Sequence, residues 1–268
     1  MHKPQKDQTG RSAAYEKDTV WLSTDETLAI MHADVQTGNW WVDGMTRISR
    51  ERFGGPVKLV DCEVHGPGSG AELFVVEGDS AAASVSGVRD SRYQAVVPMQ
   101  GKPLNAMKAS RAKVVGHPLF AALTAAVGTG IEPHFDLASL RYDRILVLMD
   151  PDADGIHCGA LMLLFFYRWM RQLLDAGRVE IVRPPWGEVA SGGELPARHA
   201  FSEPQLAALA AEIHARGTVV TRRYRGLAAI DAAVIRDTCV VPATRKTERV
   251  TTADVGAMLE MLGAYDRR

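Results

Sequence analysis

The chain has 268 residues, of which 46% are hydrophobic and 24% are charged, and its formal net charge is −1. This composition is typical of a globular protein with one large domain or two small ones, and the near-zero charge argues against a generic nucleic-acid binder. No apolar run is long enough for a membrane span, and the polar start lacks the apolar segment of a signal peptide. We therefore expect a cytoplasmic protein with no membrane contact.

The first 55 residues are polar at first and then mixed, and they carry no recognisable motif. Gly54–Pro56 marks a boundary, so residues 1–55 are expected to form an N-terminal extension of unknown role. The cysteines, at Cys62, Cys158 and Cys239, are scattered and lack metal-ligand spacing. Buried free thiols are the expected state of all three.

A short buried strand is predicted at Glu72–Val76, and Glu77 is the first polar residue beyond its end. Gly78-Asp79-Ser80 and three alanines follow, and such a small-residue helix start lets a backbone or a phosphate approach closely. Another strand is predicted at Ala95–Pro98, and the tight basic turn Gly101-Lys102-Pro103 comes after it.

The next predicted element is a helix over Pro118–Val127, which Gly128 and Gly130 close. Gly128-Thr129-Gly130 lacks the third glycine and the preceding strand of a dinucleotide fingerprint. No glycine-rich phosphate loop ending in Gly-Lys-Ser/Thr occurs in the chain either. The sequence therefore predicts no ATP site.

The most informative stretch is an apolar run at Ile145–Met149, which is short and rich in branched residues and so predicts a buried strand. Asp150, Asp152 and Asp154 follow at once, before Gly155. Three carboxylates at the end of a buried strand cannot all stay ionised without a cation, and hard oxygen ligands suit Mg²⁺ or Mn²⁺. The alternative is a solvated acidic turn, which the strand–acid–helix order makes the weaker interpretation.

The same six residues, Asp150–Gly155, copy the start of a calcium-binding EF-hand loop. That loop needs a preceding helix and a bidentate Glu at its twelfth position. Here a strand precedes it and the twelfth position is Leu161, so the EF-hand interpretation is rejected.

Beyond the acids the elements alternate, which predicts an α/β fold with a parallel sheet. The first predicted elements are a helix over Cys158–Leu174, a strand at Val179–Val182 and a loop at Val189–Leu195. They are followed by a helix from the Ser202 capping box to about Ala215, a strand at Val219–Tyr224 and a helix from Thr252 to Leu262. Basic residues concentrate in two segments, 89–113 and 216–249. Two basic segments that flank an acidic cluster are expected where a nucleic-acid phosphate backbone is guided to a bound cation. Two solvent-exposed basic faces without a ligand would give the same residue counts.

Several of these motifs together resemble the Toprim domain and C-terminal tail of type IIA DNA topoisomerase B subunits, of the gyrase and topoisomerase IV kind. The residues that carry the resemblance are Glu77-Gly78-Asp79-Ser80, Asp150-x-Asp152-x-Asp154-Gly155-x-His157, Lys58–Cys62, Pro98-x-x-Gly101-Lys102-x-Leu104-Asn105, Lys108-Ala109, Leu140-Arg141-Tyr142, Pro184-Pro185 and Arg223-Tyr224-x-Gly226-Leu227. They follow one another in the family's order from about Gly54 onward.

The resemblance implies a Rossmann-like Toprim domain over residues 56–190, with a mainly parallel sheet flanked by helices, and a small α+β tail over residues 191–268 packing on it. It implies a site of three kinds of residue. The metal ligands would be Glu77, Asp150, Asp152 and Asp154; catalytic roles would fall to Glu77, Asp150, Asp152, Lys102 and His157; DNA contacts would come from Lys102, Asn105, Lys108, Arg223 and Arg225.

The implied cofactor is Mg²⁺, with Mn²⁺ possible, and the implied partners are DNA, a gyrase A-like breakage–reunion subunit that supplies the attacking tyrosine, and a separate ATPase subunit. Tyr142, Tyr167 and Tyr224 fall in strand or helix patterns and are expected to pack rather than attack. Only 76 residues precede Glu77, so no ATPase domain is expected ahead of it in this chain. His157 would either cap or hydrogen-bond the acidic loop, or lie near the DNA phosphate.

Several positions depart from the family pattern: Ala82, Ala83, Gln100, Pro103, Ile156, Gly159, Ala228 and Ala229. Three hypotheses follow. The chain is the Toprim part of a topoisomerase that works with a partner, or a non-catalytic module that binds DNA or a gyrase, or an autonomous Mg²⁺-dependent nuclease. The last needs a general base, for which the sequence offers no strong candidate.

Overall fold

The computed structural model describes residues 58–191, 196–215 and 218–265, together with the backbone of 19–24, 27–34 and 39–42. The chain divides into two compact units, Met1–Pro56 and Val57–Arg268. The first contains an antiparallel sheet in the order β1-β2-β3, made of β1 (Thr19–Thr24), β2 (Thr27–Asp34) and β3 (Asn39–Val42). The sequence had offered no motif for these strands.

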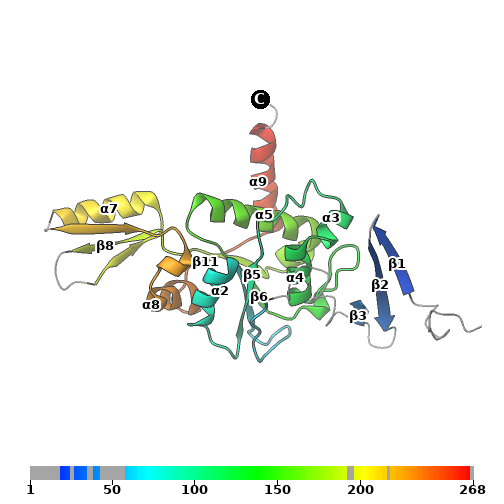
Figure 1. Cartoon of the computed structure of the whole chain (residues 1–268). Helices are drawn as coiled ribbons and strands as arrows, with labels where there is room; N and C mark the ends of the chain where they lie inside the picture. The colour runs from blue at the N-terminus through cyan, green and yellow to red at the C-terminus, as the bar shows by residue number, and fades with distance from the viewer. Residues whose placement is uncertain are drawn as a thin grey trace, which may run out of the picture. The chain divides into compact units, whose positions relative to one another are not determined.

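The second unit is built on a five-stranded sheet in the order β11-β7-β6-β4-β5 (Figure 1). Its strands are β4 (Glu72–Glu77), β5 (Gln94–Met99), β6 (Arg144–Leu148), β7 (Val179–Val182) and β11 (Thr247–Arg249). The first four pair in parallel, and β11 adds an antiparallel edge. The predicted α/β fold with a mainly parallel sheet is therefore confirmed.

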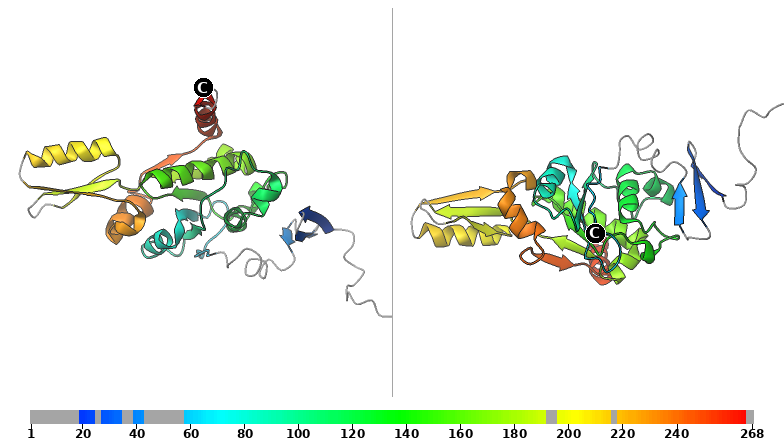
Figure 2. Two further views of the ribbon diagram at one scale, coloured as in Figure 1. Left: turned by 45° about the horizontal axis from the view of Figure 1, so that its top comes forward. Right: turned by 90° about the horizontal axis from the view of Figure 1, so that it is seen from below.

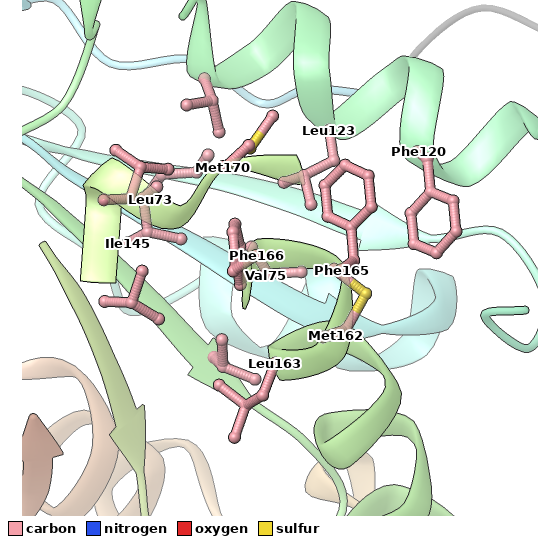
Figure 3. Close-up of a cluster of buried hydrophobic side chains, with 14 of the residues drawn as sticks. Leu73, Val75, Phe120, Leu123, Ile145, Met162, Leu163, Phe165, Phe166 and Met170 are labelled. Atoms are coloured by element: carbon pink, nitrogen blue, oxygen red, sulfur yellow. The ribbon is translucent and has the colours of Figure 1, made fainter. Parts of the chain in front are cut away.

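Side chains alternate between the two faces of this sheet, because successive residues of a strand point to opposite sides. On one face, Leu73 and Val75 of β4 and Ile145 of β6 join the helices α4 (Pro118–Val127) and α5 (Ala153–Trp169) in the larger buried cluster (Figure 3). Phe120 and Phe165 stack there with ring centroids 4.2 Å apart. Residues 74, 76, 146 and 148 face the other way, into a second cluster.

Helix α5 differs from the prediction at both ends. It begins at Ala153, inside the acidic stretch, because the Asp152 side chain caps it by accepting a hydrogen bond from the Gly155 amide at 2.8 Å. It ends at Trp169, since Met170 leaves helical geometry (φ −139°), and the short helix α6 (Arg171–Asp175) continues from there. Two of the three predicted ligands of the acidic loop therefore belong to a helix N-terminus.

The loop predicted at Val189–Leu195 is wrong where the structure describes it. Residues 187–191 form the strand β8 (Gly187–Ser191), which lies between β9 (Arg198–Ala200) and β10 (Val219–Arg223) in an antiparallel sheet, while residues 192–195 lie outside the described part. Helix α7 (Glu203–His214) packs on this sheet through Leu206 and Leu209 (Figure 2). The strand was missed because its sequence, GEVAS, offers only one large apolar residue.

The remaining elements are α2 (Gly78–Ser86), α3 (Arg111–Val115), η1 (Leu137–Ser139), η2 (Leu227–Ala229), α8 (Ala232–Ile235), η3 (Arg236–Val240) and α9 (Thr252–Tyr265). The cap of α9 is Thr251 rather than Thr252, because Thr251 exchanges hydrogen bonds with Asp254. Among the described residues, no helix is both long and apolar enough to cross a bilayer. All three cysteines are buried free thiols, as predicted.

Residues after β10 pack back onto the five-stranded sheet. Tyr224 and Leu227 are fully buried in the second cluster, against strands β4 and β6. Arg245 donates two hydrogen bonds to Glu72, at 2.6 and 2.7 Å, and these two side chains are 2% and 3% exposed. Because both side chains are buried, losing either one would leave the other charge buried without its partner. The intact ion pair therefore helps to hold the C-terminal segment on strand β4.

Candidate metal centre

The predicted acids lie at the point in the sheet where the strand order reverses. From β4 the chain moves outward to β5, and from β6 it moves the opposite way to β7, so the neighbours β4 and β6 flank a topological switch point. Ligands of open α/β sheets bind outside the carboxyl ends of strands at this point. Glu77 ends β4 and Asp150 lies just beyond β6.

Glu77 is held by the turn into α2. Gly78 takes a left-handed conformation (φ +77°) there, which only glycine adopts without strain. The Oε2 atom of Glu77 is buried and has no hydrogen-bond partner among the described residues. Burial raises the pKa of Glu77, and the negative charges of Asp150, Asp154 and Asp152 raise it further. A buried carboxylate oxygen without a donor, facing three other carboxylates, fits a cation site.

Asp150 is oriented by the C-terminal segment. Its Oδ1 accepts a hydrogen bond from the backbone amide of Leu227 at 2.8 Å. Burial raises the pKa of Asp150, the Leu227 amide lowers it, and Asp152 raises it again. Asp150 is therefore aimed by a backbone donor that leaves its second carboxylate oxygen for a ligand.

The two remaining acids differ in their surroundings. Asp152 uses Oδ1 to cap α5, so one of its oxygens is fixed by the helix. Asp154 is exposed, and its Oδ1 accepts a hydrogen bond from Lys102 Nζ at 2.5 Å. Lys102, and to a smaller degree His157, lower the pKa of Asp154. The basic turn after β5 thus supplies a counter-charge to the acids.

The arrangement fits a divalent cation. Ligand atoms of Glu77, Asp154 and Cys158 lie within 4.8 Å of one another, and the Cys158 sulfur is 3.9 Å from Glu77 Oε1. Carboxylate oxygens are the ligands that Mg²⁺ and Mn²⁺ prefer. Among the described residues this group contains Glu77 and Asp154 of the predicted ligands but neither Asp150 nor Asp152, which act on Glu77 through their negative charge.

A second group of potential ligands does not fit a metal. Asp61, Cys62 and His65 also have their ligand atoms within 4.8 Å of one another. The Asp61 carboxylate, however, already accepts hydrogen bonds from His65, Tyr142 and the Arg141 guanidinium. A cation would have to displace that guanidinium, so this cluster instead ties the segment before β4 to the chain ahead of β6.

The structure brings some of the predicted DNA contacts to the acids. Lys102 forms an ion pair with Asp154. His157 is exposed on the first turns of α5 and close enough to Asp154 to affect its pKa. The N-cap of that helix is Asp152, and both roles considered for His157 stay predictions. Arg225 directly precedes the turn that contacts Asp150.

The other three predicted contacts have different surroundings. Asn105 accepts a hydrogen bond from the Met107 amide through Oδ1, so it shapes the turn after Lys102. Lys108 is exposed on the same segment. Arg223 stacks over the Trp186 ring at 4.4 Å, where it belongs to the small sheet rather than to the acid cluster.

Two participants were missed by sequence reasoning. Cys158 was assigned only a buried state, and no spacing rule links it to Glu77, which is 81 residues away. The Leu227 amide is a backbone donor, so no side-chain pattern could indicate it. The only available signal was position, because Cys158 lies four residues after Asp154, on the same face of a helix.

Comparison with known proteins agrees with the fold. Residues 72–184 match the Toprim domain family. The chain is 38% identical over 203 residues to the DNA gyrase B subunit of Thermus thermophilus and 39% identical over 200 residues to that of Thermotoga maritima. Each alignment covers 74% of this chain and 31% of the relative, so the chain matches about a third of the length of these proteins.

These matches account for the positions of the acids at the ends of β4 and β6, both inside the matched region. Residues 72–184 are therefore a Toprim domain, and over 74% of its own length the chain is similar to the B subunits of DNA gyrase.

Proposed function

We propose that this chain is the metal-holding half of a DNA cleavage and religation site of the type IIA topoisomerase kind. The observation that carries the proposal is the junction of β4 and β6, where Glu77 and Asp150 with raised pKa values lie beside Asp152 and Asp154. Four carboxylates gathered on one edge, one of them with a buried unpartnered oxygen, favour a cation over a solvated turn.

In this proposal Glu77, Asp150 and Asp152 hold one or two Mg²⁺ ions, with Mn²⁺ as a substitute and Asp154 as a further ligand. When bound, the ion supplies charge neutralisation at the scissile phosphate and the leaving sugar oxygen. Lys102 contacts a DNA phosphate after leaving Asp154, and the exposed His157 ring lies beside it. Asn105, Lys108, Arg223 and Arg225 extend the contact along the DNA backbone.

The attacking hydroxyl comes from a breakage–reunion subunit. Two of the described tyrosines are fully buried, and their hydroxyls donate to Asp61 and Glu188. Burial and these hydrogen bonds raise the pKa values of Tyr142 and Tyr224, which makes both hydroxyls poor nucleophiles. Tyr167 is half-buried beneath Arg171. These surroundings support a nucleophile supplied by another chain.

The remaining assignments follow from this role. Residues 56–190 form the metal-binding domain, residues 191–268 the tail that packs on it, and residues 1–55 an extension of unknown role. In this proposal a separate ATPase drives strand passage, and the complex works in the cytoplasm.

The test is a supercoiled-plasmid cleavage assay with Mg²⁺, run with and without a breakage–reunion subunit from the same source. We expect cleavage only when that subunit is present, with protein left covalently on the DNA. Replacing Asp150 and Asp152 by alanine together is expected to reduce cleavage by at least a hundredfold, because the ligands that place the cation are lost.

The matched control is Asp237→Asn, which alters an exposed acid in η3, paired with Arg236, and is expected to cleave as the original protein does. Cleavage without the partner and without attached protein would show an autonomous nuclease. Folded protein that binds the partner and gives no cleavage would show a non-catalytic binding module, and either result would refute the proposal.

A further inference from the structure

The carboxylate of Asp150 touches a turn 77 residues further along the chain. The Leu227 amide donates to Asp150 Oδ1 at 2.8 Å. On the other side of the same carboxylate, a Cβ built on Gly226 would lie 3.1 Å from Oδ2. The turn Gly226–Leu227 therefore contacts the Asp150 carboxylate through a donor at Oδ1, and only a residue without a Cβ at position 226 leaves Oδ2 uncrowded.

This turn is itself held in place by the core. Leu227 is fully buried in the cluster that contains Val76 of β4 and Leu148 of β6, which lie near the ends of these strands. Tyr224 anchors the approach, because its hydroxyl donates to Glu188 at 2.5 Å and its amide donates to the Trp186 carbonyl at 3.0 Å. The position of the Leu227 amide is thus fixed by contacts that involve none of the predicted metal ligands.

We propose that the Gly226–Leu227 turn is a positioning element for the metal ligand Asp150, so that cation binding and docking of the C-terminal segment are coupled. The inference rests on the metal site proposed above. Groups that hydrogen-bond a metal ligand fix its orientation, and their loss typically reduces metal affinity about 10- to 100-fold. Since coupling between two equilibria is reciprocal, a cation that binds oriented Asp150 also stabilises the turn.

Gly226→Ala is the most direct variant. The backbone at Gly226 is extended (φ −162°), so alanine adopts it without strain, and the effect comes from the methyl group against Asp150 Oδ2. We expect Mn²⁺ affinity, measured by electron paramagnetic resonance on the full chain, to fall about tenfold. Ala228→Ser is the control, because it changes an exposed side chain of the same turn and should leave Mn²⁺ affinity unchanged.

A second measurement follows the hydrogen bond from the Leu227 amide to Asp150, first in the absence of metal and then with Mg²⁺ added. Hydrogen exchange of the Leu227 amide should be slow in the original protein and in Asp150→Asn, which keeps an acceptor oxygen, and should speed up in Asp150→Ala. Adding Mg²⁺ to the original protein should slow exchange of the Leu227 amide further. Both readouts follow the contact itself rather than cleavage, so they do not depend on the presence of a partner.

The outcomes separate this inference from the proposed function. If the original protein binds Mn²⁺ and Gly226→Ala binds it equally well, the turn does not position Asp150, while the metal site stands. If Mg²⁺ leaves Leu227 exchange unchanged, the coupling is absent. If the original protein binds no Mn²⁺ at all, the metal site fails, and the coupling fails with it.

Discussion

Arg245→Met is expected to lower the free energy of unfolding by about 3–5 kcal/mol, because it leaves the buried carboxylate of Glu72 without its main partner. Arg245 donates to both oxygens of Glu72 and to the Val240 carbonyl. Gln94 also donates to Glu72, and Arg144 lies 3.6 Å from it, so we expect the lower end of this range. Urea unfolding of the full chain, followed by circular dichroism, measures the loss.

Two further variants test whether the unpaired charge of Glu72 causes the loss of stability in Arg245→Met. Adding Glu72→Gln to Arg245→Met neutralises the orphaned carboxylate and should restore part of the lost stability. Arg183→Met removes an exposed ion pair with Glu248, in which both side chains are more than half exposed, and should cost at most about 1 kcal/mol. Equal losses for Arg245→Met and Arg183→Met would contradict the role given to the buried pair.

Gly155→Ala is expected to disrupt the acidic loop itself. A Cβ at this position would lie 2.2 Å from the backbone oxygen of Asp150, a separation that non-bonded atoms cannot keep. Because the obstacle is backbone, either the start of α5 or the end of β6 must move, at a cost of about 1–3 kcal/mol. The displacement also shifts Asp150 and Asp152 relative to Glu77, so Mn²⁺ binding should weaken at least tenfold.

Gly256→Ala is the matched control for that variant. Gly256 lies in helix α9, where an added Cβ meets no atom within 4 Å. Alanine is favoured over glycine in a helix by about 1 kcal/mol, so thermal unfolding should shift upward for Gly256→Ala and downward for Gly155→Ala. A Gly155→Ala protein with unchanged stability and Mn²⁺ affinity would show that the loop tolerates the added methyl group.

Local pattern was sufficient for much of the fold. The runs at 72–77 and 144–148 are apolar and short, and both are strands with both faces buried. Helix α4 begins and ends where its proline and Gly128 predicted. Residues 189–191 were expected to lie in a loop but belong to β8, because this strand lies in a small sheet covered by α7 and its sequence lacks the apolar run of the central strands.

The candidate site, like the fold, could be predicted only in part from the sequence. The acids could be predicted because Glu77 and the stretch from Asp150 to Asp154 stand at the ends of two buried strands, and the carboxyl ends of parallel strands share one edge. The Leu227 and Cys158 contacts could not, since both depend on segments about 80 residues away being packed against the strand ends. The ion pair of Lys102 with Asp154 likewise connects the turn after β5 to the start of α5, whose proximity comes from the order of β4, β5 and β6.

The most direct test of the metal centre is Mn²⁺ binding to the full chain, counted by electron paramagnetic resonance and competed with Mg²⁺. Three forms are compared: the original protein, a Glu77→Gln, Asp150→Asn double variant, and Asp79→Asn, which alters the nearby exposed acid that pairs with Lys58. The account predicts one or two Mn²⁺ ions, displaced by Mg²⁺, in the original protein and in Asp79→Asn, and none in the double variant. Equal binding by all three folded forms would contradict it.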